Sequence, residues 1–114
     1  MTRRVIVAGS RTLRDYELVR GHLYGLLSQG DTVLCGGAAG ADLLGKRFAA
    51  ERGLPVALFR PRWEKLGRSA GPQRNLDMVL SADALVAFWD GSSRGTKDVI
   101  TKARQYGLDV TVVK

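Results

Sequence analysis

Gly36-Gly37-Ala38-Ala39-Gly40-Ala41-Asp42 follows the apolar run Thr32-Val33-Leu34-Cys35 and leads into residues with helical spacing. Glycines permit a tight turn and let a ligand's phosphate approach the backbone, because no Cβ stands in the way. The amides that open the next helix would face that phosphate, with the positive end of the helix dipole behind them. A turn of this kind also serves close packing of a strand against a helix, so both interpretations stay open.

The composition indicates a folded globular protein. Of the 114 residues, 45% are hydrophobic and 25% are charged, and this length suits one domain over residues 1–114 with its own apolar core. No apolar run has membrane-spanning length, and the start Met1-Thr2-Arg3-Arg4 lacks the apolar core and cleavage site of a signal peptide. We therefore expect a cytoplasmic protein without a membrane partner.

The chain is strongly basic, with a formal net charge of +7 and a pI near 10.2. This charge favours anionic partners such as nucleotides, nucleic acid or acidic proteins. Cys35 and His22 are the only cysteine and the only histidine, which excludes an internal disulfide and a Cys/His zinc cluster. We expect Cys35 to be a buried thiol and His22 to face solvent, and we predict no metal site.

The remaining sequence alternates between short apolar runs and segments with helical spacing. The apolar runs predict strands over residues 5–8, 32–35, 56–59, 85–88 and 110–113. The helical spacing predicts helices over residues 15–28, 41–52, 73–81 and 96–106. Residues 60–72, rich in Arg and Lys, are expected to form a long irregular loop, which is either a functional lid or a plain surface loop.

This alternation predicts an α/β fold with one five-stranded parallel sheet, in the Rossmann-like order 3-2-1-4-5, and helices on both faces. In this order the chain reverses between the first and fourth strands, so a crevice opens at their carboxyl ends. Three turns with glycines would meet at that edge, namely Gly9-Ser10-Arg11, Gly36 to Asp42, and Trp89 to Thr96. Their convergence predicts a ligand site.

The side chains of these turns suit an anionic ligand. Ser10 can donate a hydroxyl hydrogen bond and Arg11 a bidentate pair, although both also suit the capping of a turn. Arg74 is expected to reach the crevice from the third helix, and a solvated position is the alternative. The predicted ligand-binding residues are Gly9, Ser10, Arg11, Gly36, Gly37, Gly40, Asp42, Arg74, Asn75, Trp89, Asp90, Gly91, Ser92, Gly95 and Thr96.

Several of these residues have a second, structural interpretation. Thr96 belongs to an anion nest at a helix N-terminus and also suits an N-cap. Trp89 can stack on a base or complete the core. Asp42 and Asp90 can hold a ribose hydroxyl or a magnesium ion, but Asp42 is favourable in the first turn of a helix without any ligand.

Two common nucleotide-binding motifs are absent. The first turn, Gly9-Ser10-Arg11-Thr12-Leu13, lacks the later glycines of G-x-G-x-x-G, and no acidic residue ends the second strand. There is no Walker motif. A nicotinamide-dependent dehydrogenase or a phosphate-loop NTPase is therefore disfavoured.

Four segments, in order and over nearly the whole chain, resemble the YspA-type branch of the SLOG superfamily. They read VIVAGSR at 5–11, VLCGGAAGAD at 33–42, GPQRN at 71–75 and ALVAFWDGSSRGT at 84–96. Relatives include the Lonely Guy phosphoribohydrolases, the molybdenum-cofactor carrier proteins and the DNA-processing protein A family. The resemblance implies a Rossmann-like domain that binds a nucleotide or nucleotide-derived ligand in the crevice, with no other cofactor indicated.

The resemblance also bears on catalysis. Lonely Guy enzymes hydrolyse the N-glycosidic bond of nucleoside monophosphates with an arginine, which Arg74 matches, and a glutamate. The glycine-threonine part of the glutamate motif matches Gly91, Gly95 and Thr96. Val99 stands where the glutamate is expected, and Asp98 lies one position earlier. Without that carboxylate we favour binding, sensing or carriage of the ligand. The alternative is hydrolysis through Arg74 and Asp98, in which Asp42 or Asp90 could take the place of the missing glutamate.

A third interpretation concerns the basic segment from Arg60 to Arg74. With Trp63 it suits a groove for single-stranded nucleic acid, as the DNA-processing relatives suggest. Only 7% of the residues are aromatic, which leaves few stacking platforms, so this interpretation ranks last. Relatives often dimerise through their helical faces, so a homodimer is one expectation for the assembly.

Overall fold

The computed structural model describes residues 2–37 and 39–114, so Ala38 of the glycine stretch lies outside the described residues. Its strands form one parallel sheet in the order β3-β2-β1-β4-β5. The strands are β1 (Arg4–Gly9), β2 (Thr32–Cys35), β3 (Val56–Leu58), β4 (Ala84–Phe88) and β5 (Asp109–Val113). The predicted strand order and the Rossmann-like fold class are confirmed.

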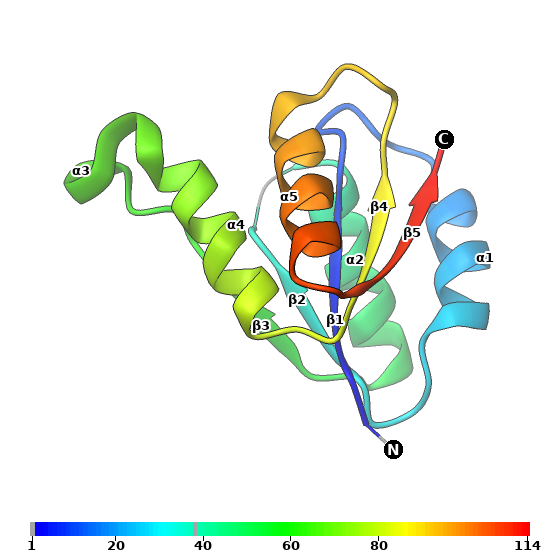
Figure 1. Cartoon of the computed structure of the whole chain (residues 1–114). Coiled ribbons are helices and arrows are strands. Elements are labelled where there is room, and N and C mark those ends of the chain that lie inside the picture. Colours follow the sequence, from blue (N-terminus) through cyan, green and yellow to red (C-terminus); the bar gives the residue numbers. More distant parts are fainter. Residues whose placement is uncertain (1, 38) are drawn as a thin grey trace.

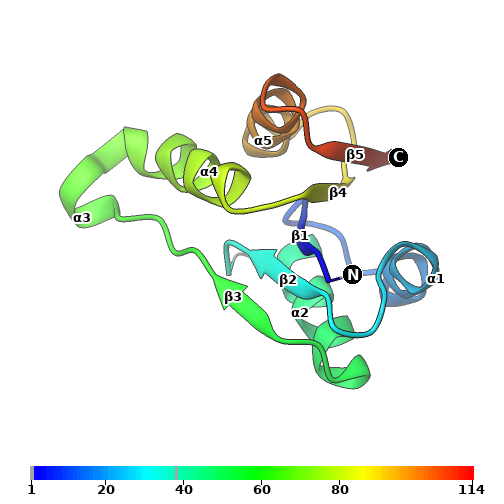
Figure 2. The same cartoon turned by 60° about the horizontal axis from the view of Figure 1, so that its bottom comes forward.

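Helices cover both faces of this sheet, as Figure 2 shows, with α1 and α2 on one face and α4 and α5 on the other. They are α1 (Tyr16–Leu26), α2 (Ala41–Arg52), α3 (Trp63–Leu66), the 3-10 turn η1 (Gly67–Ser69), α4 (Ala70–Leu80) and α5 (Arg94–Gln105). The segment of α3, η1 and the start of α4 stands away from the sheet in both views (Figures 1 and 2). Within residues 2–37 and 39–114, no helix is long and apolar enough to cross a bilayer.

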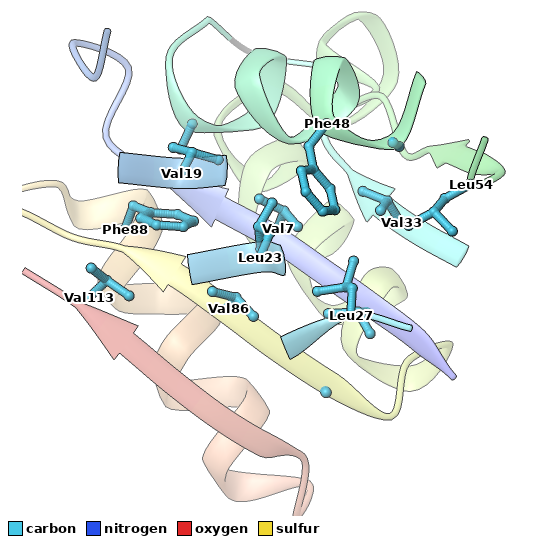
Figure 3. Close-up of a cluster of buried hydrophobic side chains, with 14 of the residues drawn as sticks. Val7, Val19, Leu23, Leu27, Val33, Phe48, Leu54, Val86, Phe88 and Val113 are labelled. Carbon is cyan, nitrogen blue, oxygen red and sulfur yellow. The ribbon is translucent and has the colours of Figure 1, made fainter. Parts of the chain in front are cut away.

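The strands are apolar on both sides because successive side chains point to opposite faces. Val7 and Val33 face α1 and α2, where they meet Leu23 and Phe48 (Figure 3), and none of these four is more than 2% exposed. Ile6 faces the other side, in the cluster formed with α4 and α5. Cys35 is buried and His22 is exposed, as predicted.

The prediction of a long irregular loop over residues 60–72 is wrong. Most of that segment is helical, and α4 begins at Ala70, three residues before the predicted start. Pro72 lies in the first turn of α4, where a proline is tolerated because the first amides of a helix need no partner within it. The short helix α3 ends at Gly67, whose φ is 54°.

Charged side chains close the amino edge of the sheet, where the strands begin. Asp31 is completely buried, and its two carboxylate oxygens accept the N–H groups of Arg3 and Ser28, each at 2.9 Å. Asp83 accepts the N–H of Arg4 at 2.8 Å. The guanidinium groups of Arg3 and Arg4 donate in turn to backbone carbonyls, at 2.7 and 2.6 Å. The charges at this edge are thus used by the fold itself.

Candidate functional site

The turns that follow β1, β2 and β4 meet at the carboxyl edge of the sheet, near the start of α5 (Figure 1). The N–H of Ser10 donates to the carbonyl of Phe88 at 3.0 Å, and the N–H of Ala41 donates to the carbonyl of Ser10 at 3.2 Å. The Ser10 hydroxyl accepts the N–H of Asp90 at 3.4 Å. The turn after β1 therefore ties the other two turns together, and the predicted convergence is present.

Gly40 allows this close approach. Its φ is 76°, and a Cβ at this position would overlap the carbonyl oxygen of Ser10 and lie 2.6 Å from the Cα of Arg11. Because both obstacles are backbone, neither can move aside cheaply. A glycine is thus needed at residue 40 because the turns after β1 and β2 contact each other there. Gly40 lines neither of the two pockets described next.

The first of these pockets, the small pocket, has a volume of about 80 Å³ and lies between β1, α4 and the start of α5. It is lined by Ala8, Gly9, Arg11, Asp42, Arg74, Asn75, Met78, Ser93, Gly95, Thr96 and Val99. Its polar walls are well shielded, since Asp42, Asn75 and Thr96 are all less than 9% exposed. Seven of the predicted ligand-binding residues come together here.

The large pocket has a volume of about 420 Å³ and lies on the β2 and β3 side of Arg74. It is lined by Arg11, Gly36, Gly37, Ala39, Arg60, Pro61, Trp63 and Arg74. Arg60, Pro61 and Trp63 were absent from the predicted set of ligand-binding residues, and as a binding surface the segment from Arg60 to Arg74 with Trp63 was considered only as a groove for single-stranded nucleic acid. The signal that points to them is their place directly after the third strand, since all parallel strands end at the same edge.

Arg74 separates the two pockets and lines both. Its guanidinium donates to the Asn75 side-chain oxygen at 2.9 Å and to the carbonyl of Gly36 at 3.3 Å. A Cβ on Gly36 would overlap this guanidinium, so the missing side chain at residue 36 makes room for Arg74. Burial lowers the pKa of Arg74, and the nearby Asp42 carboxylate opposes that shift. Arg74 is thus a half-buried cation facing two cavities.

Asp42 has a structural role that the sequence alternative anticipated. It lies in the first turn of α2, and its carboxylate accepts the N–H of Gly36 at 2.9 Å, which closes the glycine loop in front of the helix. It also lines the small pocket. The described part of the chain contains no group of three or more His, Cys, Asp or Glu side chains able to hold a metal ion.

The structure does not bring Asp98 into either pocket. Its carboxylate accepts hydrogen bonds from Lys102 at 2.6 Å and from the Asn75 amide at 2.9 Å. Asn75 also donates to the carbonyl of Gly95 at 3.3 Å, so this group joins α4 to α5. Val99 lines the small pocket at the position where the resemblance expects a glutamate.

The turn after β4 is held by its own hydrogen bonds. Asp90 accepts the N–H groups of Ser92 and Ser93 at 2.8 and 3.1 Å, and these bonds hold the pKa of its carboxyl below the ordinary value. The indole N–H of Trp89 donates to the carbonyl of Ser93 at 3.1 Å. Ser93, rather than Thr96, is the N-cap of α5. Several polar groups that the sequence suggested for a ligand thus stabilise the turn.

Five predicted ligand-binding residues of the β1 and β4 turns lie outside both pockets. Ser10, Trp89 and Asp90 instead line a third, mainly apolar cavity of about 270 Å³ on the other side of the β1 turn, together with Leu13 and Phe88. Ser92 and Gly91 are exposed in the β4 turn. The structure therefore divides the predicted ligand-binding residues into those around Arg74, which line the small and large pockets, and those near Asp90, which do not.

Comparison with known proteins now assigns the chain to a family. A family model described as the YspA, cpYpsA-related SLOG family matches residues 3–66. The Gene 61 protein of Mycobacterium phage D29 is 38% identical over 117 residues, which cover 95% of this chain and 94% of the phage protein. The chain belongs to the YspA, cpYpsA-related SLOG family. The resemblance seen in the sequence is confirmed.

A solved structure supports the fold of this SLOG-family chain. The X-ray structure of TM1055, a structural-genomics target, matches with a TM-score of 0.68 at 22% identity, over 96% of this chain and 72% of that one. The segment matched by the SLOG family model holds every described residue of the large pocket except Arg74. The large pocket is therefore built mainly from the part of the chain that identifies the family.

Proposed function

We propose that this SLOG-family chain binds a nucleotide or nucleotide-derived small molecule at the carboxyl edge of its sheet, as a binding, sensing or carrier protein. The observation that carries the proposal is that Arg11 and Arg74 line both pockets. An anionic group of the ligand that is held between Arg11 and Arg74 would lie at one pocket, and the rest of the ligand would occupy the other pocket. Guanidinium groups favour phosphate because they can donate two parallel hydrogen bonds to it.

The small pocket suits the phosphate. A water molecule takes about 30 Å³ of liquid volume, so about 80 Å³ leaves room for one compact anionic group. Gly95 lies in the first turn of α5, where the helix dipole favours negative charge, whereas the N–H of the neighbouring Thr96 is donated to the side chain of Ser93. Together with Arg74, this end of α5 supplies donors from two directions.

The large pocket suits the remainder of the nucleotide. Trp63 and Pro61 offer flat apolar surface against which a base or a sugar can pack. Gly36 and Gly37 leave the backbone of the β2 turn accessible on the facing side, since neither carries a side chain. The two pockets together therefore match a ligand with a compact anionic end and a planar body.

Binding ranks above the phosphoribohydrolase alternative. N-glycosidic hydrolysis needs a carboxylate at the reacting ribose, and Asp98 is engaged with Lys102 outside both pockets. Asp42 is the one carboxylate among the described residues of the small pocket, and it already accepts the Gly36 N–H. A groove for single-stranded nucleic acid ranks third, because Trp63 is the one tryptophan in the basic segment and such grooves stack several bases.

Calorimetry with AMP, ADP, ADP-ribose and inorganic phosphate tests the proposal. We expect binding of at least one nucleotide, and a loss of about 10- to 100-fold in affinity for Arg74→Gln, because a hydrogen bond to a charged group contributes about 1.5–3 kcal/mol. Arg104→Gln, which makes the same charge change on the exposed side of α5, is the matched control and should bind like the parent protein.

Two outcomes would count against the proposal. Absence of heat with every nucleotide would remove nucleotide binding, and equal affinity of the parent protein and Arg74→Gln would remove the proposed site. Chromatography of the same mixtures decides the enzymatic alternative. Release of free base from AMP, lost in Arg74→Gln, would place hydrolysis above simple binding.

A further inference from the structure

The large pocket holds more positive charge than one phosphate in the small pocket can use. Arg11, Arg60 and Arg74 all line it, and its described lining residues include no Asp or Glu. Like charges in one cavity repel each other unless an anion lies between them. Arg11 and Arg60 are exposed and Arg74 is half-buried, and this concentration of guanidinium groups favours an anionic ligand.

Arg60 and Arg11 differ from most other arginines of the chain in their contacts. Arg3, Arg4 and Arg14 donate side-chain hydrogen bonds to backbone carbonyls. Within residues 2–37 and 39–114, the side chains of Arg11 and Arg60 make no hydrogen bond or ion pair with the protein. Both guanidinium groups thus keep their donors available at the wall of a cavity.

Arg60 is placed where a second anionic group would meet it. It belongs to the wall of the large pocket formed after β3, beside Pro61 and Trp63, and it does not line the small pocket. Arg11 and Arg74 lie between the two pockets, so a molecule that enters both would pass them and reach Arg60 last. A nucleoside monophosphate with its phosphate in the small pocket would present only an uncharged base or sugar to Arg60.

We infer that the ligand is a nucleotide with two separated phosphate groups, such as a nucleoside 3',5'-bisphosphate, and that Arg60 binds the second group. This inference rests on the proposed function, which assigns the first group to the small pocket. Arg60 is then the residue that distinguishes such ligands from nucleoside monophosphates. Trp63 and Pro61 would contact the uncharged part between the two anionic groups.

The test compares AMP with adenosine 3',5'-bisphosphate by calorimetry, on the parent protein and two variants. Arg60→Gln removes the proposed contact. Arg68→Gln makes the same charge change in the nearby 3-10 turn η1, at an exposed residue that lines neither pocket. We expect the parent protein and Arg68→Gln to bind adenosine 3',5'-bisphosphate about tenfold or more tightly than AMP, the effect of one charge-assisted hydrogen bond. In Arg60→Gln that difference should disappear.

Each other outcome is informative. Equal affinity of the parent protein for AMP and adenosine 3',5'-bisphosphate would overturn the inference and leave the proposed function intact. A preference for the bisphosphate that Arg60→Gln retains, or that Arg68→Gln loses equally, would assign that preference to overall charge and overturn the inference as well. Absence of binding by both nucleotides, and by ADP and ADP-ribose, would instead overturn the proposed function.

Discussion

The amino and carboxyl edges of the sheet both gather charged side chains, but they use them differently. At the amino edge Asp31 and Asp83 accept backbone N–H groups, and Arg3 and Arg4 donate to backbone carbonyls. At the carboxyl edge three arginines line open cavities. Charge at one edge completes the backbone hydrogen bonding of the strands, whereas charge at the other is available to a ligand. Substitutions at the two edges should therefore affect different properties.

The largest expected effect concerns the glycines of the carboxyl edge. Gly40→Ala places a Cβ against the backbone of Ser10 in a left-handed conformation, and we expect a loss of ~3 kcal/mol in the free energy of unfolding. Gly36→Ala is the matched comparison, because its Cβ meets the movable guanidinium of Arg74. It should lose less stability but displace Arg74 and weaken nucleotide binding. Urea unfolding and calorimetry measure the two properties, and equal losses of stability would contradict this distinction.

The amino edge should give the opposite pattern. Asp31→Asn leaves one oxygen where two accepted N–H groups, so we expect a loss of about 2 kcal/mol in the free energy of unfolding with nucleotide affinity unchanged. Asp109→Asn is the control, since Asp109 is exposed and pairs with Arg3 at 3.8 Å, a surface contact of small effect. A change in nucleotide affinity for Asp31→Asn would show that the two edges are coupled.

The smallest effect tests whether Asp90 behaves like an amino-edge carboxylate. Hydrogen bonds from the amides of Ser92 and Ser93 lower its pKa, so the folded state favours the ionised carboxyl. Its contribution to stability is complete above the pKa of the unfolded chain and is lost as the pH falls through the lower folded pKa. An NMR titration should show the Ser92 and Ser93 amides shifting together at acid pH, and Asp90→Asn should abolish that transition. Amides that do not respond to acid in the parent protein would rule out the role.

The sequence predicted best where glycines and apolar residues set the local structure. The helix from Ala41 to Arg52 was predicted to its exact bounds, because Gly40 and Gly53 flank it and their backbone angles suit no other residue well. The helical segment after β3 was missed. A helix as short as Trp63–Leu66 has too few residues to show a hydrophobic period, and Pro72 suggested an entrance rather than an interior position.

For the site, the strand order was sufficient to place Gly36 at the carboxyl edge of the sheet. Arg74 lies on a helix, and the sequence left a solvated position open for it. The strand order was not sufficient for Trp89 and Asp90, whose hydrogen bonds within their own turn direct them to another cavity. Residue type alone does not distinguish a serine or aspartate that builds a turn from one that binds a ligand. Arg60 follows the third strand, so the strand order places it at the same edge, but the predicted set of ligand-binding residues did not include it.

The space beside Gly36 has a consequence for how this sequence can vary. That space is filled by Arg74, a residue 38 positions later, so a larger residue at position 36 would displace the guanidinium of Arg74 from its present place. The two positions are therefore expected to change together among homologues, because contacting residues depend on one another. Residue 74 lies beyond the segment 3–66 that identifies the family, yet its freedom to mutate is set by a glycine inside that segment.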